Sequence, residues 1–207
     1  MKDEKDYIRD IAEIRSMMEH STKFLSLSGW AGIFAGVYAL IGAWMAYSIY
    51  QFDPVEGVAD IGSANPVFTQ SGLIVLALIV LIMAIGTAIF LSYRKAQNRG
   101  EKIWNATSRR LVVNMVVPLI TGGLLILILI SRGMIGMTAS VTLIFYGLAL
   151  YNAGRDSFGE VRKLGLIEIV LGLISACFID LSLIIWAIGF GLLHIIYGIY
   201  IHYKHER

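Results

Sequence analysis

Charged residues are scarce in this sequence, and that scarcity is the first constraint on what it can be. They make up 15% of its 207 residues, whereas soluble domains carry about 25%. Hydrophobic residues account for 57% of the chain. A chain of this composition has too few charges to cover its apolar residues with a soluble surface, so we expect a membrane protein.

Cysteine, proline and recognisable catalytic motifs are also nearly absent. The single cysteine, Cys177, excludes an internal disulfide framework and a multi-thiolate zinc site. The sequence has no phosphate-binding Walker loop, no serine nucleophile elbow and no zinc-binding HExxH helix. We also expect no cleavable signal peptide, because the first apolar run, from Phe24, is too long for one. We therefore expect no catalytic residues and no cofactor.

Six long apolar runs dominate the chain. They cover about Phe24–Tyr50, Pro66–Tyr93, Leu111–Ser131, Met134–Asn152, Val161–Phe178 and Ser182–Tyr203. A helix needs about 20 apolar residues to cross a hydrocarbon core of about 30 Å. The sequence therefore predicts an all-α integral membrane protein whose six transmembrane helices form three hairpins within residues 24–203.

The first 23 residues are predicted to form an amphipathic cytoplasmic helix that does not cross the membrane. Tyr7, Ile11 and Ile14 recur at helical spacing and give one apolar stripe. Two interpretations remain open for this arm. It either docks a partner or senses the membrane, or it rests on its own bundle and on lipid headgroups.

Lysine and arginine are distributed very unevenly between the connecting segments. Sixteen of the 17 lie in the N-terminal arm, the second and fourth loops and the tail, and only Arg132 lies elsewhere. The longest connection, Gln51–Gln70, contains acidic residues but no basic ones. The positive-inside rule then predicts an inner (cytoplasmic) membrane protein with both termini, including the tail at 204–207, in the cytoplasm.

Glycine is the residue that the apolar runs contain in excess, with 21 in the chain. Small residues allow membrane helices to approach closely. The glycines that we expect at helix contacts are Gly32, Gly36, Gly165, Gly172, Gly191 and Gly198. Pro118 is predicted to kink the third span, because it removes a hydrogen bond and frees the carbonyl of Asn114.

Three polar side chains lie inside the predicted spans: Asn114, Glu168 and His194. Counted at the helical rise, all three fall in the cytoplasmic half of the membrane. Intramembrane ionisable residues usually face the bundle interior and have a partner. One hypothesis is a protonatable cluster that titrates near neutral pH and biases two packings of the bundle. The alternative is structural: Glu168 extends towards the cytoplasmic surface, and His194 bonds to a backbone carbonyl or to Tyr197.

Two further patterns have simpler interpretations than a site. His202, His205 and Glu206 do not make the three-ligand set with outer support that a metal needs, and they fit a charged tail beside lipid headgroups. We therefore predict no metal site. The basic second loop adjoins the membrane, so it is expected to attract anionic lipid and not nucleic acid.

Two stretches of the last predicted hairpin carry a family likeness. They read Gly165-Leu-Ile-Glu-Ile-Val-Leu-Gly-Leu and Trp186-Ala-Ile-Gly-Phe-Gly-Leu-Leu-His-Ile-Ile-Tyr-Gly-Ile. This hairpin, about a fifth of the chain, resembles the HdeD-type bacterial membrane proteins. The resemblance implies a small six-span protein linked to acid stress, and it implies no site residues.

Two classes of function are compatible with these features. The first is a non-enzymatic membrane protein, stress-related, sensory or accessory, that acts through helix packing and association. Its expected partners are membrane lipids and either a second copy or another membrane protein. The alternative is a small proton-linked transporter or channel that uses Asn114, Glu168 and His194.

Overall fold

The computed structural model of this chain describes residues 28–55, 57–58, 66–98, 104, 106–154 and 159–205. The amphipathic helix predicted for residues 1–23 and the last two residues of the tail lie outside these ranges. The boundaries and contacts given below therefore concern the apolar part of the chain and the segments that adjoin it.

The described chain is almost entirely helical, which confirms the predicted all-α class. Its helices are α2 (Gly29–Ser48), α3 (Pro66–Asn98), α4 (Ala106–Ser131), α5 (Met137–Ala153), α6 (Gly159–Cys177), α7 (Ser182–Trp186) and α8 (His194–His205). A 3₁₀ turn, Ile179–Leu181, precedes α7, and a π-helical stretch, Ala187–Leu193, joins α7 to α8. Two short strands, β1 (Phe52–Asp53) and β2 (Gly57–Val58), pair in antiparallel fashion between α2 and α3.

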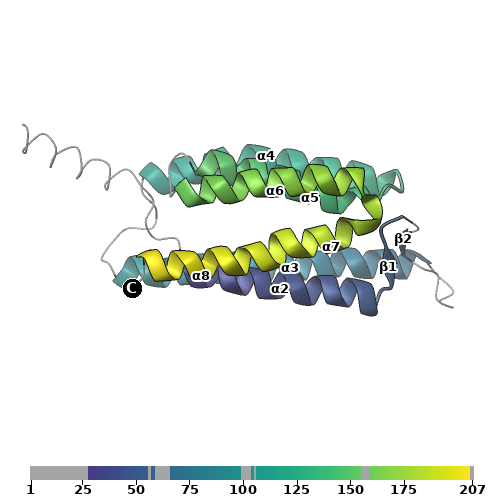
Figure 1. The fold of residues 1–207 in the computed structure, drawn as a ribbon, viewed down its shortest axis with the longest axis horizontal. Coiled ribbons are helices and arrows are strands. Elements are labelled where there is room, and N and C mark those ends of the chain that lie inside the picture. The colour runs from purple at the N-terminus through teal and green to yellow at the C-terminus, as the bar shows by residue number, and fades with distance from the viewer. Residues whose placement is uncertain are drawn as a thin grey trace, which may run out of the picture.

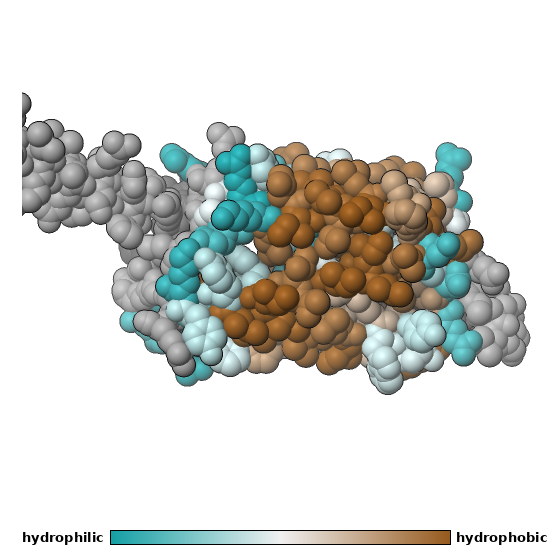
Figure 2. Space-filling view, viewed as in Figure 1, coloured by the Kyte–Doolittle hydropathy of each residue, from teal (hydrophilic) through white to brown (hydrophobic). Residues whose placement is uncertain are grey.

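Several of these helices are long and apolar enough to cross a membrane. The segments are Gly29–Ser48, Ser71–Asn98, Ser108–Ser131 and Ile179–Lys204, with a shorter apolar helix at Met137–Ala153. Figure 2 shows that hydrophobic side chains cover the middle of the visible face, with hydrophilic residues gathered at its two ends. Large apolar side chains exposed over such an area require a hydrocarbon environment, so the chain is a multi-pass membrane protein.

The helix ends differ from the predicted ones where the apolar runs meet the loops. A loop was predicted for all of Arg94–Arg110, but α3 continues to Asn98 and α4 begins at Ala106. The prediction was wrong there because hydropathy does not set a helix end: arginine, lysine, alanine and glutamine are good helix formers outside lipid too. Conversely, α5 begins at Met137 and not at Met134.

The helices form two layers (Figure 1). In the upper layer, α5 packs between α4 and α6, and in the lower layer, α2 packs between α3 and α8. Although α6 and α8 are close in the chain, they belong to different layers, and each packs mainly on a helix of its own layer. The short α7 connects the layers, because it contacts α5 and α6 as well as α2. We call the interface of α5 and α6 with α7, the π-helical stretch and α8 the seam.

Glycines bring α2 and α8 of the lower layer into backbone contact. A Cβ atom at Gly36 would lie 2.5 Å from the carbonyl oxygen of Gly191, and one at Gly198 would lie 2.5 Å from that of Gly29. A Cβ atom at Gly32 would lie 3.1 Å from the His194 carbonyl oxygen. No larger residue fits at the first two contacts without moving the backbone.

The upper layer uses the same device between α5 and α6. A Cβ atom at Gly165 would lie 2.6 Å from the carbonyl oxygen of Gly147, and one at Gly147 would lie 2.7 Å from that of Gly165. About two turns further along α6, a Cβ atom at Gly172 would lie 2.6 Å from the Ile144 side chain. Each layer is therefore held by close helix contacts that depend on glycine.

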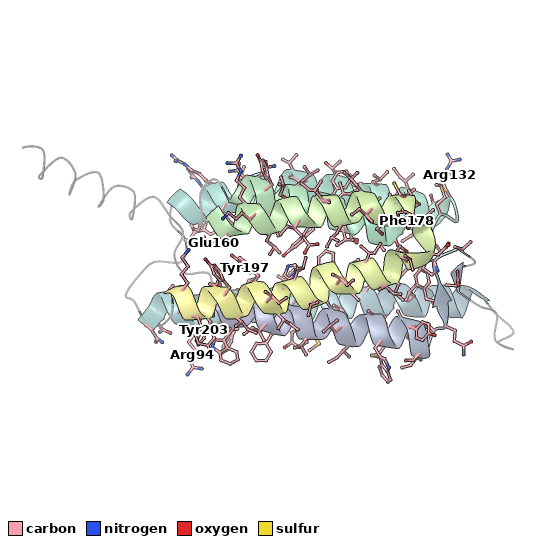
Figure 3. The ribbon with its side chains drawn as sticks, viewed as in Figure 1. Arg94, Arg132, Glu160, Phe178, Tyr197 and Tyr203 are labelled. Carbon is pink, nitrogen blue, oxygen red and sulfur yellow. The ribbon has the colours of Figure 1, made fainter. Side chains whose placement is uncertain are left out.

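The two ends of the bundle differ in charge. Arg94, Glu160 and Tyr203 lie at one end, and Arg132 lies at the other (Figure 3). The first end, here called the Lys204 end, collects every described lysine and arginine except Arg132: Arg94, Lys95, Arg109, Arg110, Arg162, Lys163 and Lys204. The opposite end is called the Arg132 end.

The glycine contacts lead to a stability prediction. Gly165→Ala should lower the free energy of unfolding by about 1–3 kcal/mol, because the added methyl group overpacks the α5–α6 contact. Gly86→Ala in α3 is the matched control, since nothing lies within 4 Å of a Cβ atom at that position. Thermal or denaturant unfolding of both variants in detergent measures the effect. Equal stability of the two variants would contradict the packing described for α6.

Candidate functional site

Glu168 is the most deeply buried ionisable side chain at the seam. It is the tenth of the nineteen residues of α6, and its exposed fraction is 0%. Neither carboxyl oxygen has a hydrogen-bond partner within the described part of the chain. A buried polar group left in this state costs about 1–3 kcal/mol, and more when it is charged. The position of this carboxyl group therefore calls for a functional or structural explanation.

His194 is the nearest ionisable partner of Glu168. It is the first residue of α8, and its exposed fraction is 5%. Its Nδ1 atom lies 3.5 Å from Oε1 of Glu168 and 3.0 Å from the carbonyl oxygen of Gly189. Its Nε2 atom lies 2.9 Å from the hydroxyl oxygen of Tyr146 on α5. The imidazole ring thus joins the lower layer to two helices of the upper layer.

These contacts determine where the proton lies on a neutral His194 ring. The Gly189 carbonyl can only accept a hydrogen bond, so Nδ1 must carry the proton and donate it. Nε2 is then the acceptor, and the Tyr146 hydroxyl donates to it. A small rotation would carry the Nδ1 proton from the Gly189 carbonyl towards Glu168, which lies only 0.5 Å further away.

The π-helical stretch Ala187–Leu193 shapes the lower-layer side of the site. A Cβ atom at Gly189 would lie 2.6 Å from Oε2 of Glu168, so only glycine leaves room for the carboxyl group. Phe190 stacks on the His194 ring at 5.7 Å with an interplanar angle of 12°. Local π-helical turns frequently occur at functional sites, and here the turn places a glycine and an aromatic ring around one ion pair.

Further polar contacts follow the seam on both sides of Glu168. Towards the Arg132 end, the Ser140 and Ser175 hydroxyls bond to each other at 2.8 Å within the upper layer, and both side chains are fully buried. The fully buried Ser182 hydroxyl of α7 has no hydrogen-bond partner within the described chain. The Trp186 indole donates to the Thr142 hydroxyl across the seam at 3.0 Å. Towards the Lys204 end, the buried Tyr197 hydroxyl has no hydrogen-bond partner within the described chain.

The structural interpretation of Glu168 and His194 is correct in one part and wrong in two. Glu168 does not extend to the cytoplasmic surface, because its side chain ends in the seam and is fully buried. His194 does bond to a backbone carbonyl, that of Gly189, but its tyrosine partner is Tyr146 and not Tyr197. The expected tyrosine lies on the same helix as His194, whereas the ring points across the seam towards α5.

Asn114 and Pro118 lie on α4. The α4 helix packs against α5, and Asn114 is partly buried there. Its membership of a cluster with Glu168 and His194 stays a prediction. Pro118 lies inside α4, which continues as a helix on both sides of it, and the kink also stays a prediction.

No group of three or more metal-binding side chains occurs among the described residues. Of the three tail residues considered for a metal, His202 packs edge-on against the Trp30 ring at 5.5 Å, while Glu206 lies outside the described residues.

The Glu168–His194 pair can share a proton. One proton can lie on the carboxyl group or on the imidazole, giving a neutral pair or an ion pair across the seam.

Several residues of the site carry no signal that sequence reasoning could have used. Tyr146 is one of ten tyrosines in the chain, and Gly189 is one of 21 glycines. Ser140 lies between two threonines, Thr138 and Thr142, whereas Ser175 lies alone in an apolar run. A hydroxyl residue in a membrane helix can bond to its own backbone, so its partner on another helix becomes visible only in the fold.

Comparisons with known proteins leave the site to be interpreted from its geometry. No protein-family model matches this chain, and no curated protein or solved structure is significantly similar to it.

The geometry of His194 leads to a spectroscopic prediction. In protein labelled with ¹⁵N-histidine, neutral His194 should be the Nδ1-protonated tautomer, the less common form in water, because the Gly189 carbonyl accepts from Nδ1. Replacing His20, His202 and His205 by Gln leaves one histidine signal to assign by nuclear magnetic resonance. Tyr146→Phe should shift the Nε2 signal and leave the tautomer unchanged. An Nε2-protonated ring in the parent protein would contradict the hydrogen bonds described.

Proposed function

We propose that this protein is a non-enzymatic, polytopic inner-membrane protein of the sensory or accessory kind. In this proposal, the protonation state of the Glu168–His194 pair sets how its two layers pack. The observation that supports it most directly is the complete burial of Glu168 at 3.5 Å from His194, on opposite sides of the seam. Burying a single charged side chain at this site costs free energy, whereas a carboxylate and an imidazolium attract each other strongly there. The gain or loss of one proton by the pair therefore changes the interaction between the two layers.

The proposal includes six spans arranged as three hairpins, with both termini in the cytoplasm. Support comes from the basic residues, which all lie at the Lys204 end apart from Arg132 within the described chain. The positive-inside rule places such an end in the cytoplasm. The resemblance of the last hairpin to HdeD-type proteins agrees with a stress-related role, and it stays a prediction.

The proposed association surfaces are the outermost helices, α3 and α4. Each packs against a single helix of its own layer, and their other faces carry exposed apolar side chains such as Ile82 and Val117, both 67% exposed. Membrane lipids cover such faces by default. A second copy or another membrane protein would bind there by replacing lipid.

A second candidate function is a small proton-linked transporter. The observation that favours it is a set of buried polar groups within the bundle: the Ser140–Ser175 pair, Glu168, and the unpartnered hydroxyls of Ser182 and Tyr197. Burial of Glu168 from both ends favours the sensory role instead, because transport requires access from two sides.

Few other ionisable groups surround the pair. Tyr146 faces His194 from α5, and Tyr197 lies one turn further along α8. The α2 helix, which packs on α8, contains only two tyrosines as ionisable side chains, Tyr38 and Tyr47. Glu160 of α6 also pairs with Lys204 of α8 at the end of the seam. A response to pH in the neutral and acidic range is therefore assigned to Glu168 and His194 only where Glu168→Gln removes it.

The sensory proposal predicts a pH-dependent change in packing at the seam. Trp186 reports it, because its indole bonds to Thr142 across the seam. In a variant that keeps only this tryptophan, with Trp30, Trp44 and Trp104 replaced by Phe, its emission should shift between about pH 5 and pH 8. Glu168→Gln should abolish the shift, since the carboxamide does not titrate.

Asp180→Asn is the matched control, since this exposed carboxyl group lies in the turn before α7. It should leave the Trp186 response unchanged. An emission that is constant with pH in the parent protein, or a shift that survives in Glu168→Gln, would overturn the sensory proposal.

Proton flux separates the sensory proposal from the transport candidate. Under the sensory proposal, vesicles that contain the purified protein and a trapped pH dye should acidify no faster than empty vesicles when an external acid pulse is applied. This result is expected because Glu168 is sealed within the seam. Flux that exceeds the empty-vesicle rate and is lost in Glu168→Gln would replace the sensory proposal by the transport candidate.

A further inference from the structure

Arg162 of α6 is held in place at the Lys204 end of the upper layer. A Cβ atom at Gly154, the residue that follows α5, would lie 2.6 Å from the Cβ atom of Arg162, so the start of α6 packs directly on the end of α5. The guanidinium carbon lies 4.4 Å from the centroid of the Tyr151 ring, and the guanidinium donates a hydrogen bond to the Tyr151 hydroxyl. A cation that is already stacked and bonded loses little freedom when it binds a ligand.

The Arg162 guanidinium still has donors for a further partner. An arginine side chain is always charged and carries five N–H donors in one plane, and the Tyr151 hydroxyl accepts from one of its nitrogens. Arg162 is exposed, and no carboxylate of the described chain lies within ion-pair distance of it. A phosphate group matches such a side chain, because its oxygens accept two parallel hydrogen bonds from one guanidinium.

The surroundings of Arg162 are positively charged. Its neighbour Lys163 is exposed, and so is Arg110 at the same end of α4. The described chain has one surface carboxylate at this end, Glu160, which is paired with Lys204. This excess of basic groups favours an anionic ligand over a zwitterionic one.

An exposed apolar face of α6 begins beside Arg162 and runs towards the middle of the molecule. Leu166, Val170 and Leu173 follow Arg162 at helical spacing, and they are 53%, 50% and 54% exposed. Leu173 lies about 16 Å from Arg162 along the helix, which is close to half of a hydrocarbon core of about 30 Å. Figure 2 shows hydrophilic residues directly beside the hydrophobic band at this end. A ligand with an anionic head and long apolar chains fits both parts.

We propose that Arg162, held on the Tyr151 ring, binds the phosphate group of an anionic phospholipid whose acyl chains lie along the exposed face of α6. The site goes beyond the proposed sensory function and does not depend on it, since Arg162 and Tyr151 contact neither Glu168 nor His194. A water-soluble phosphate would use the guanidinium alone and leave the apolar face of α6 uncovered. The site is therefore assigned to a lipid.

Native mass spectrometry of the full-length protein in detergent tests the site, with the affinity for the first bound lipid as the readout. The parent protein should bind phosphatidylglycerol more tightly than phosphatidylcholine. Arg162→Gln should weaken phosphatidylglycerol binding by about fivefold or more, the effect expected for one basic side chain at a membrane surface. Arg132→Gln is the matched control, because it removes the same charge at the opposite end, and it should bind as the parent does.

A second pair of variants separates a built site from general attraction to positive charge. Tyr151→Leu keeps every charge but removes the ring under the guanidinium, so it should weaken phosphatidylglycerol binding by about twofold to fivefold. Tyr203→Leu, which replaces an exposed tyrosine of α8 at the same end, should have no effect.

Thermal unfolding in detergent shows that each variant is folded before its lipid affinity is compared. Parent-like affinity in Arg162→Gln or in Tyr151→Leu would overturn the proposal, and so would an equal loss in Arg132→Gln. Displacement of phosphatidylglycerol by an equal concentration of glycerol phosphate would also overturn it, because the site would then belong to a soluble phosphate.

Discussion

A carboxyl group buried among apolar side chains cannot obtain hydrogen bonds from them, and this constraint organises the bundle around Glu168. The helix that carries it turns the carboxyl group inwards, to a position that is 0% exposed and 3.5 Å from His194. The facing helix makes room with a glycine, Gly189, within a π-helical stretch. The aromatic rings of Tyr146 and Phe190 then close the site around the imidazole. Any other arrangement would expose a charge to hydrocarbon or leave it unpaired.

Contacts within the layers and contacts between them differ in kind. Inside each layer, glycines bring backbones together, as at Gly36 with Gly191 and at Gly165 with Gly147. Such contacts leave little freedom, because association in lipid depends on close van der Waals packing. Across the seam, side chains make the contacts, and many of them are polar. A change in protonation therefore acts at the interface with the greatest freedom to adjust, between two units that are each tightly packed.

The two ends of the bundle differ in the charged groups that they carry. Apolar side chains around Phe52 cover one end, whereas the Glu160–Lys204 ion pair lies at the other. The same end collects the basic residues of the described chain. The proposed cytoplasmic position of that end rests on the positive-inside rule. The complete burial of Glu168 is more compatible with the proposed sensory role than with proton transport.

Hydropathy, counted along the chain, was enough to predict the all-α class and the four long apolar helices together with the shorter one at Met137–Ala153, because the free energy of placing a segment in lipid is a sum over its own residues. The membrane crossing of α6 stays a prediction. The same reasoning singled out Glu168 and His194, since each is expensive in hydrocarbon wherever its helix packs. It did not predict that Glu168 is sealed in the seam, that Tyr146 bonds to His194, or that Gly189 leaves space for the carboxyl group. Those features depend on how each helix is rotated about its axis and on which helices face one another. That rotation is set by contacts between residues far apart in the chain, as where Gly198 meets Gly29, and only the tertiary structure contains them.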